Sequence, residues 1–212
     1  MLNFSLFGIP VRVEPLHWIT LVIIGGLNLD PQTSFGIALL GVFVVAGFLS
    51  ILIHELGHAL VGRMFGSRGT FIVLQAMGGY AAYPDARFTQ KQSFLATLAG
   101  PSFQLAAGAI AYSIRVFGGV TQPGLFHFLW FFQLVSVFWA IINLIPVLPL
   151  DGGRLVQTAL GPKRQKLSFQ ISMVAAGLFA VFALTKGFMF GAVFLGYFGY
   201  QSFQAYQQLN YR

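Results

Sequence analysis

The chain has 212 residues, of which 57% are hydrophobic and only 8% are charged. Soluble domains carry roughly a quarter charged residues, so this composition excludes a soluble globular protein and indicates a polytopic membrane protein. The absence of cysteine leaves histidine and carboxylates as the metal-binding side chains. The net charge of +7 does not indicate a nucleic-acid partner, because the basic residues lie between apolar runs rather than in one patch with aromatics. We expect one domain over residues 1–212.

Apolar runs in chain order predict an all-α membrane protein with about six transmembrane helices, the first being the shortest. They cover residues 15–29, 35–65, 93–117, 125–148, 168–185 and 187–206. If the N-terminus is cytoplasmic, ten of the twelve basic residues lie on the cytoplasmic side, and only Arg115 and Lys186 lie outside. The sequence therefore predicts an integral multi-pass protein of the cell membrane with both termini in the cytoplasm.

A small membrane-associated β-hairpin is predicted between the second and third apolar runs, at residues 69–84. Residues 70–73 favour a strand, Gly78 and Gly79 a turn or bulge, and residues 80–83 a return strand. The segment is too short to cross a membrane. Residues 3–13 predict one more strand, which Pro10 should restrict to the edge of a sheet.

Two of the five acidic residues lie in or at the end of apolar runs, where an ionisable group is by default functional: Glu55 and Asp151. Glu55 belongs to a His-Glu-x-x-His pattern with His54 and His58. Positions four apart lie on one helix face, so both imidazoles can bind one Zn²⁺, and the glutamate between them can take a proton from water. The alternative is a pair of packed histidines, which leaves Glu55 unexplained. We expect one zinc ion per chain.

A catalytic zinc needs a third protein ligand and one open position. The nine residues from His54 to Arg63 place the pattern about 14 Å below the cytoplasmic boundary. Asp151 can reach that depth if the chain around Pro146 and Pro149 is a broken helix that dips inward. The alternative is a turn or helix N-cap aspartate before two glycines. His17 and His127 are expected to be packed or interfacial rather than ligands.

The second motif, residues 143–154 (NLIPVLPLDGGR), resembles a signature of the site-2 protease family, whose first signature is a membrane-embedded His-Glu-x-x-His. The resemblance covers residues 50–160 and implies that Asp151 is the third zinc ligand, in a compact form without PDZ or CBS domains. Asn143 resembles a family position near the site, where its amide would orient substrate or support the oxyanion; the alternative is a hydrogen bond between helices. Family members commonly carry Asn where this chain has Gln104, which leaves the role of that side chain open.

The resemblance implies an intramembrane zinc metalloendopeptidase that cleaves single-pass membrane proteins within or near their transmembrane segment. The expected active site lies nearer the cytoplasmic face, within the lipid bilayer. The hairpin is expected to offer an edge to which an extended substrate adds as a strand. Gly100, Gln104 and Gly108 recur every four residues and predict a face on which the third helix approaches the second. The alternatives are an inactive binding or chaperone protein on the same fold, and a metal transporter, which should carry more than one such cluster.

Overall fold

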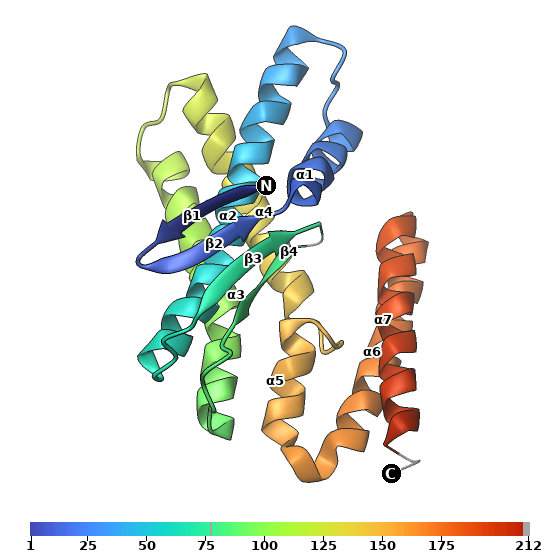
Figure 1. Cartoon of the computed structure of the whole chain (residues 1–212). Helices are drawn as coiled ribbons and strands as arrows, with labels where there is room; N and C mark the ends of the chain where they lie inside the picture. Colours follow the sequence, from blue (N-terminus) through green and yellow to red (C-terminus); the bar gives the residue numbers. More distant parts are fainter. Residues whose placement is uncertain (77, 210–212) are drawn as a thin grey trace. The chain divides into compact units, whose positions relative to one another are not determined.

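The computed structural model describes residues 1–76 and 78–209, and it divides into two compact units. The first unit consists of Met1–Arg87 and Ala99–Ala140, and the second of Phe88–Leu98 and Ile141–Arg212. Figure 1 labels the helices and strands in chain order. The elements wholly within the first unit are β1 (Leu2–Leu6), β2 (Ile9–Val13), α1 (Pro15–Asn28), α2 (Ser34–Met64), β3 (Phe71–Gln75) and β4 (Gly78–Ala82).

The four strands form one sheet in the order β1-β2-β3-β4 (Figure 1). The pairs β1–β2 and β3–β4 are antiparallel, as hairpins require, whereas β2 and β3 are parallel. The two residues between β1 and β2, Phe7 and Gly8, both have positive φ (51° and 71°), which matches the twist of a two-residue hairpin. The hairpin predicted at residues 69–84 is thus part of a larger sheet.

The prediction that Pro10 restricts its strand to a sheet edge is wrong, because β2 lies between β1 and β3. The pairing register gives the reason. Pro10 pairs with Ser5 on β1, but the ladder with β3 begins only at the next residue, Val11. The missing N–H of proline therefore interrupts no bond to β3.

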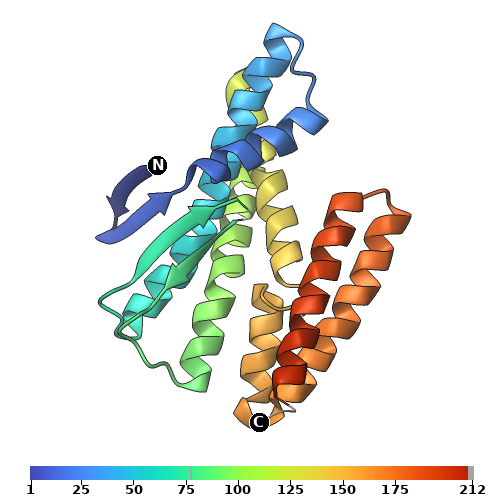
Figure 2. The same ribbon diagram turned by 45° about the vertical axis from the view of Figure 1, so that its right-hand side comes forward.

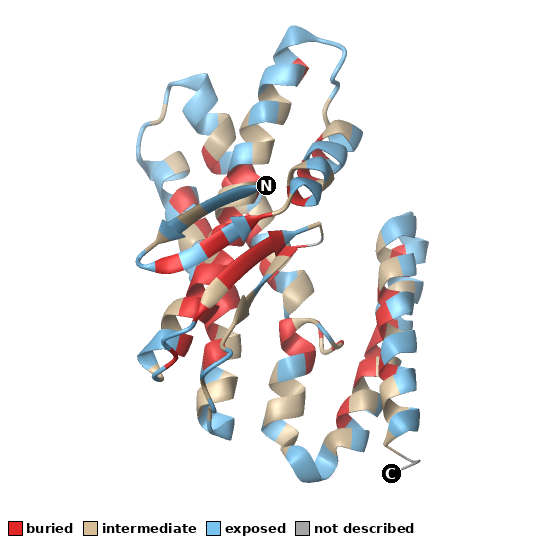
Figure 3. Ribbon diagram, viewed as in Figure 1, coloured by how far each residue is buried: buried red, intermediate tan, exposed pale blue. Residues whose placement is uncertain are grey.

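The sheet packs on α2 through a core of apolar side chains (Figure 3). β3 and β4 contact α2, and α1 contacts both α2 and β3. Proline at the first position of α1 and the Thr33 hydroxyl, which accepts from the Gly36 N–H at 2.9 Å, define the starts of the two helices. At the other end of α2, the Arg63 guanidinium donates to the Phe7 carbonyl at 2.8 Å. The buried core residues are Ile9, Val11, Val13, Leu21, Ile51, Leu52, Leu56, Ala59, Ile72 and Leu74.

The second unit contains α5 (Asp151–Leu160), a 3-10 turn (Pro162–Arg164), α6 (Gln165–Thr185) and α7 (Met189–Gln208). α6 and α7 form a helical hairpin, which Figure 2 shows from the side. Inside it, the Ser172 and Ser202 hydroxyls lie 2.8 Å apart, and the Leu148 N–H donates to Ser172 at 2.7 Å. The loop before α5 is thereby tied to both helices of the hairpin.

Two further helices have residues in both units: α3 (Gln90–Phe117) and α4 (Pro123–Asn143). After α4, the N–H groups of Leu144 and Ile145 donate to carbonyls three residues earlier, as in a 3-10 turn, and not four residues earlier as in an α-helix. Pro146 follows, and it has no N–H with which the helix could continue. The helix break predicted around Pro146 and Pro149 is confirmed, whereas its depth in a membrane stays a prediction.

Among the described residues, four helices are long and apolar enough to cross a membrane, rather than six. They are 34–64, 90–117, 123–143 and 162–185. The first predicted span forms α1, which is only 14 residues long. The last forms α7, whose second half carries four glutamines and is too polar to be one of the four. In the most apolar 18-residue stretch of each of these four helices, only 28–39% of the residues are buried within the protein. Most of their apolar surface therefore faces outward, as lipid contact requires.

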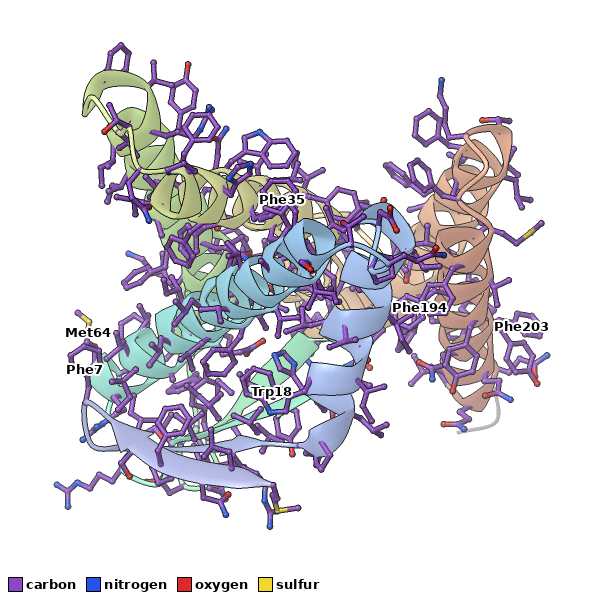
Figure 4. The ribbon with its side chains drawn as sticks, turned by 90° about the horizontal axis from the view of Figure 1, so that it is seen from above. Phe7, Trp18, Phe35, Met64, Phe194 and Phe203 are labelled. Carbon is purple, nitrogen blue, oxygen red and sulfur yellow. The ribbon has the colours of Figure 1, made fainter. Side chains whose placement is uncertain are left out.

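Side chains at the surface fit the same environment (Figure 4). Phe203 points outward from α7, and Phe35 lies exposed at the start of α2. Trp18 instead packs inward and stacks on Phe48, with ring centroids 4.8 Å apart. The helices therefore expose aromatic and aliphatic groups that a soluble domain would cover.

The connection from α2 to β3 depends on one carboxylate, Asp85. It accepts from the Ser67 hydroxyl at 2.8 Å and from the N–H groups of Arg68 and Gly69 at 2.7 and 3.0 Å. These bonds, the Ser67 bond first, lower the pKa of Asp85 below its ordinary value. The carboxylate thus fixes three consecutive residues.

We predict that acid releases this connection. A lowered folded-state pKa means that the bonds are complete above the unfolded-state pKa of about 3.9 and are lost as the pH falls through the folded-state value. Amide exchange at Arg68 and Gly69 should therefore accelerate only well below pH 4. Asp85→Ala should show that fast exchange already at pH 6; protection retained in this variant would contradict the assignment.

Candidate metal centre

The middle of α2 carries His54, Glu55 and His58, whose side chains are 2%, 3% and 8% exposed. The two histidines are four residues apart in an unbroken helix, so their rings lie on one face, one turn apart. Their Nε2 atoms are 3.1 Å apart. Two ligands of a tetrahedral zinc with Zn–N bonds of 2.0–2.1 Å lie about 3.3 Å apart. The donor pair fits such an ion.

Gln104 of α3 fixes the orientation of the first imidazole. The His54 Nδ1 lies 2.9 Å from the Gln104 Oε1, and because an amide oxygen only accepts, the proton is on Nδ1. The His54 Nε2 is then the lone-pair nitrogen that a metal requires. The Gln104 amide nitrogen in turn donates to the Ser50 hydroxyl at 2.9 Å, and that hydroxyl lies 2.9 Å from the Ser136 hydroxyl.

These connected hydrogen bonds beside His54 were not predicted from the sequence. Gln104 is fully buried, as are Ser50 and Ser136. The signal that could have found them is a polar side chain inside a membrane helix, which needs a named partner. The predicted spacing of Gly100, Gln104 and Gly108 does mark one face of α3, but its members have different neighbours.

Glycines let α3 approach α2 beside the histidines. A Cβ on Gly100 would lie 2.2 Å from the His58 Nε2, and one on Gly57 would lie 2.6 Å from the Ala99 carbonyl oxygen. Both positions therefore exclude a side chain. Gly108 contacts α4 rather than α2, because a Cβ there would lie 2.9 Å from the Ser136 Cβ. The predicted approach of the third helix to the second is confirmed at Gly100 and Gln104 and is wrong at Gly108.

The backbone of β4 passes beside the glutamate of the pattern. A Cβ added to Gly79 would lie 2.9 Å from the Glu55 Cγ. β4 is the last strand of the sheet, so among the described residues one side of its backbone is not paired with another strand. The edge strand of the sheet thus touches the buried carboxylate, through the face on which a Gly79 side chain would lie.

In the second unit, Asp151 is the first residue of α5 and is 8% exposed. It is not the N-cap, which is Leu150. The next two residues must be glycine, since a Cβ on Gly152 would lie 2.2 Å from the Leu144 carbonyl oxygen and one on Gly153 would lie 2.4 Å from the Leu148 nitrogen. The Asp-Gly-Gly sequence lets α5 begin directly against the loop that precedes it.

The three predicted metal ligands are divided between the two units, with His54 and His58 in the first and Asp151 in the second, and their convergence on one ion stays a prediction. The other predicted residues lie elsewhere in their elements. Asn143 is the last residue of α4 and is half-buried, and its role stays a prediction. The ring of His127 is half-buried and lies 2.7 Å from the Pro123 carbonyl oxygen, while that of His17 is bonded to Gln75. Both histidines are packed or interfacial, as expected.

Comparison with protein families gives a match of residues 113–186 to the model of peptidase family M50. The chain is 28% identical over 160 residues to the zinc metalloprotease MJ0392 of Methanocaldococcus jannaschii, and 30% identical over 147 residues to the stage IV sporulation protein FB of Bacillus subtilis. These alignments cover 76% and 69% of this chain, which spans 45% and 46% of the length of those relatives. Rip2 of Mycobacterium tuberculosis is 29% identical over 226 residues, covering 87% of this chain and 86% of that protein.

Among solved structures, the site-2 protease from Methanocaldococcus jannaschii has the same fold. The TM-score is 0.67 at 24% identity, over 95% of this chain and 94% of that one. The predicted fold, an apolar helical protein with a small sheet, is confirmed. With the two sequence signatures, the M50 match and these similarities support the predicted membership of the site-2 protease family of zinc metalloproteases, peptidase family M50.

Proposed function

We propose that this protein is an intramembrane zinc metalloendopeptidase. The observation that carries the proposal is the pair of imidazole Nε2 atoms 3.1 Å apart on α2, with a buried glutamate between them in sequence. α2 is one of the helices apolar enough to span a membrane. Family membership and the names of the relatives as zinc metalloproteases support the same activity.

His54, His58 and Asp151 are the proposed ligands of the metal. Two imidazoles and one carboxylate are a donor set typical of catalytic zinc, and they leave a fourth position open. A bound zinc would supply Lewis-acid chemistry, polarising the scissile carbonyl and making water acidic enough to attack it. The residues of the chain itself must then hold the ligands, move the proton and position the peptide.

Glu55 is the proposed general base and acid. Its carboxylate would accept a proton from the attacking water and return it to the leaving amine. The residue follows His54 directly in the helix, so it stands beside the donor pair without being one of the ligands. Its burial keeps bulk water from competing for the proton, so the reaction needs a polar path for water from the cytoplasmic side.

Asn143 is the proposed substrate-binding or oxyanion-supporting residue. Its position at the end of α4, eight residues before Asp151 in sequence, fits the family motif. A carboxamide can donate to an oxyanion without titrating. The role is a proposal from chemistry and resemblance.

The proposed substrates are single-pass membrane proteins cleaved within or near their transmembrane segment. Helical carbonyls are occupied by the hydrogen bonds of the helix, so the segment must unwind before attack. An unwound segment needs new backbone partners, and the edge of β4 beside Glu55 offers them. The edge belongs to β4 and not to residues 71–73, because β3 lies between β2 and β4.

The proposed location is the cell membrane, with cytoplasmic termini and the active site nearer the cytoplasmic face. The clusters of basic residues between the apolar helices support this orientation through the positive-inside rule. The proposed partners are the bilayer and its membrane proteins. Both units are proposed to serve one protease domain.

The alternative is an inactive binding or chaperone protein on the same fold. A binding protein would have no use for a buried carboxylate beside the imidazole pair, whose burial alone is unfavourable. A transporter is disfavoured because, among the described residues, only one group of metal-binding side chains is found. Glu55 is therefore the residue that separates the proposals.

Glu55→Gln should retain one zinc per chain and lose cleavage of a membrane-embedded substrate by about 10²–10⁴-fold, because glutamine cannot accept the proton. Zinc content by elemental analysis and cleavage in detergent or vesicles measure the two effects. Asp151→Asn is the matched control and should lose zinc and activity together. Equal cleavage by Glu55→Gln and wild type would remove the proposed mechanism.

Gln104→Leu should weaken zinc binding by about 10- to 100-fold, because His54 loses the acceptor that holds its tautomer. Competition with a chelator measures the affinity. Gln104→Glu keeps an oxygen acceptor and should restore most of it. If both variants bind zinc like the wild type, the Gln104 contact does not serve the metal.

Proline at Tyr80 or Ala81 tests the strand edge. Alternate N–H groups of an antiparallel strand face the partner strand and the open side, so one proline breaks a bond to β3 and the other removes an outward donor. One of the two proline variants should leave the amide protection of the hairpin intact. The hypothesis predicts that this variant still cleaves about tenfold more slowly and retains its zinc. Ala81→Val, which keeps the N–H, should cleave like the wild type. Wild-type cleavage by that proline variant would exclude strand addition.

A further inference from the structure

The β3–β4 hairpin reaches Glu55 through one backbone position. At Gly79 an added Cβ would lie 2.7 Å from the Leu74 Cδ2 and 2.9 Å from both the Val73 oxygen and the Glu55 Cγ. The strand is therefore in direct contact with the glutamate side chain. A small shift of the hairpin would change what Glu55 faces.

The tip of the same hairpin contacts two helices outside the sheet. Gly78 has a φ of +115°, and a Cβ there would lie 3.1 Å from the Trp139 Cζ2 of α4. Its partner in the ladder, Gln75, has a carbonyl oxygen 3.1 Å from the His17 Nδ1 of α1. The closing pair of the hairpin is thus held by α1 on one strand and by α4 on the other.

His17 makes this contact with its ring almost wholly buried, at 1% exposed. Because a carbonyl only accepts, the Nδ1 carries the proton and donates it to Gln75. Its Nε2 has no hydrogen-bond partner among residues 1–76 and 78–209, and its neighbours are the rings of Trp18 and Phe48, 5.9 and 6.1 Å away between centroids. A polar side chain is therefore buried among aromatics, and its bond to Gln75 is directed to the hairpin.

We propose that His17 is a positioning residue that holds the tip of the β3–β4 hairpin so that β4, the edge strand, stays against Glu55. The proposal rests on the proposed function, in which this edge receives the substrate. The hydrogen bond from His17 fixes Gln75, which is paired with Gly78. Gly79, the residue after Gly78, is the one that touches Glu55. A substrate strand added to β4 would take its register from this arrangement, so His17 would set which peptide bond Glu55 faces.

The test uses His17→Leu, which removes the donor, and His17→Asn, whose amide nitrogen can replace the Nδ1–H. Loss of the buried hydrogen bond to Gln75 should lower kcat/KM about tenfold. We expect the change in His17→Leu mainly as a higher KM, with zinc retained and with faster amide exchange at residues 78–82. His17→Asn should recover most of both, and His127→Leu, at a histidine whose bond is to Pro123, should behave as wild type.

Wild-type KM and wild-type exchange in His17→Leu would overturn the proposal. So would equal impairment of the leucine and asparagine variants, since that would assign His17 to packing alone. The exchange measurement needs no substrate, so it tests whether His17 holds the hairpin even if the wild-type protein does not cleave. Absence of cleavage by the wild-type protein would count against the proposed function and not against this role of His17.

Discussion

The structure depends on one constraint: a polar group inside the apolar part of α2 must find its partner within the protein. Lipid supplies no hydrogen bonds, so each imidazole, hydroxyl and carboxylate there needs a neighbour from another element. The connected bonds from Ser136 through Ser50 and Gln104 to His54 meet this requirement in the first unit. The same bonds determine which ring nitrogen of His54 carries the lone pair that a metal requires. The hydrogen bonds that satisfy the buried polar groups therefore also orient the imidazole of His54, a proposed metal ligand.

Close approach of backbones is the second requirement, and glycine meets it. At Gly57 and Gly100 the helices carrying the imidazoles and Gln104 come near enough for a 2.9 Å contact, and at Gly79 a strand reaches the glutamate. In the second unit, Gly152 lets α5 begin against the preceding loop. Each of these glycines is next to a proposed functional side chain in sequence or in space. Small residues at membrane-helix contacts commonly serve packing, and here packing also fixes the distances of the site.

Much of this arrangement could be predicted from the sequence, because its signals are local. The His-Glu-x-x-His spacing, the hairpin glycines and the break before Pro146 depend on neighbours within a few residues. The role of Gln104 could not be derived in this way, since it arises where α3 crosses α2, fifty residues away. The parallel pairing of β2 with β3 is likewise non-local, and because of it Pro10 lies in an inner strand and not in the predicted edge strand. The count of spans failed at its weakest members, a short helix and one rich in glutamine, where hydropathy alone does not decide.

An open strand edge is normally a liability that proteins cover or shorten. β4 is only five residues long, and as the edge strand it touches Glu55 at Gly79. A substrate leaving its helix needs backbone partners, and an enzyme that supplied them far from the base would gain binding without catalysis. In the proposed mechanism, holding β4 against the glutamate joins the two needs, because the bonds that would stabilise the unwound segment would also present its peptide bond to the proposed base. The contacts of α1 and α4 with the hairpin tip would then matter for the same reason as the proposed zinc ligands, because each limits where a reacting group can lie.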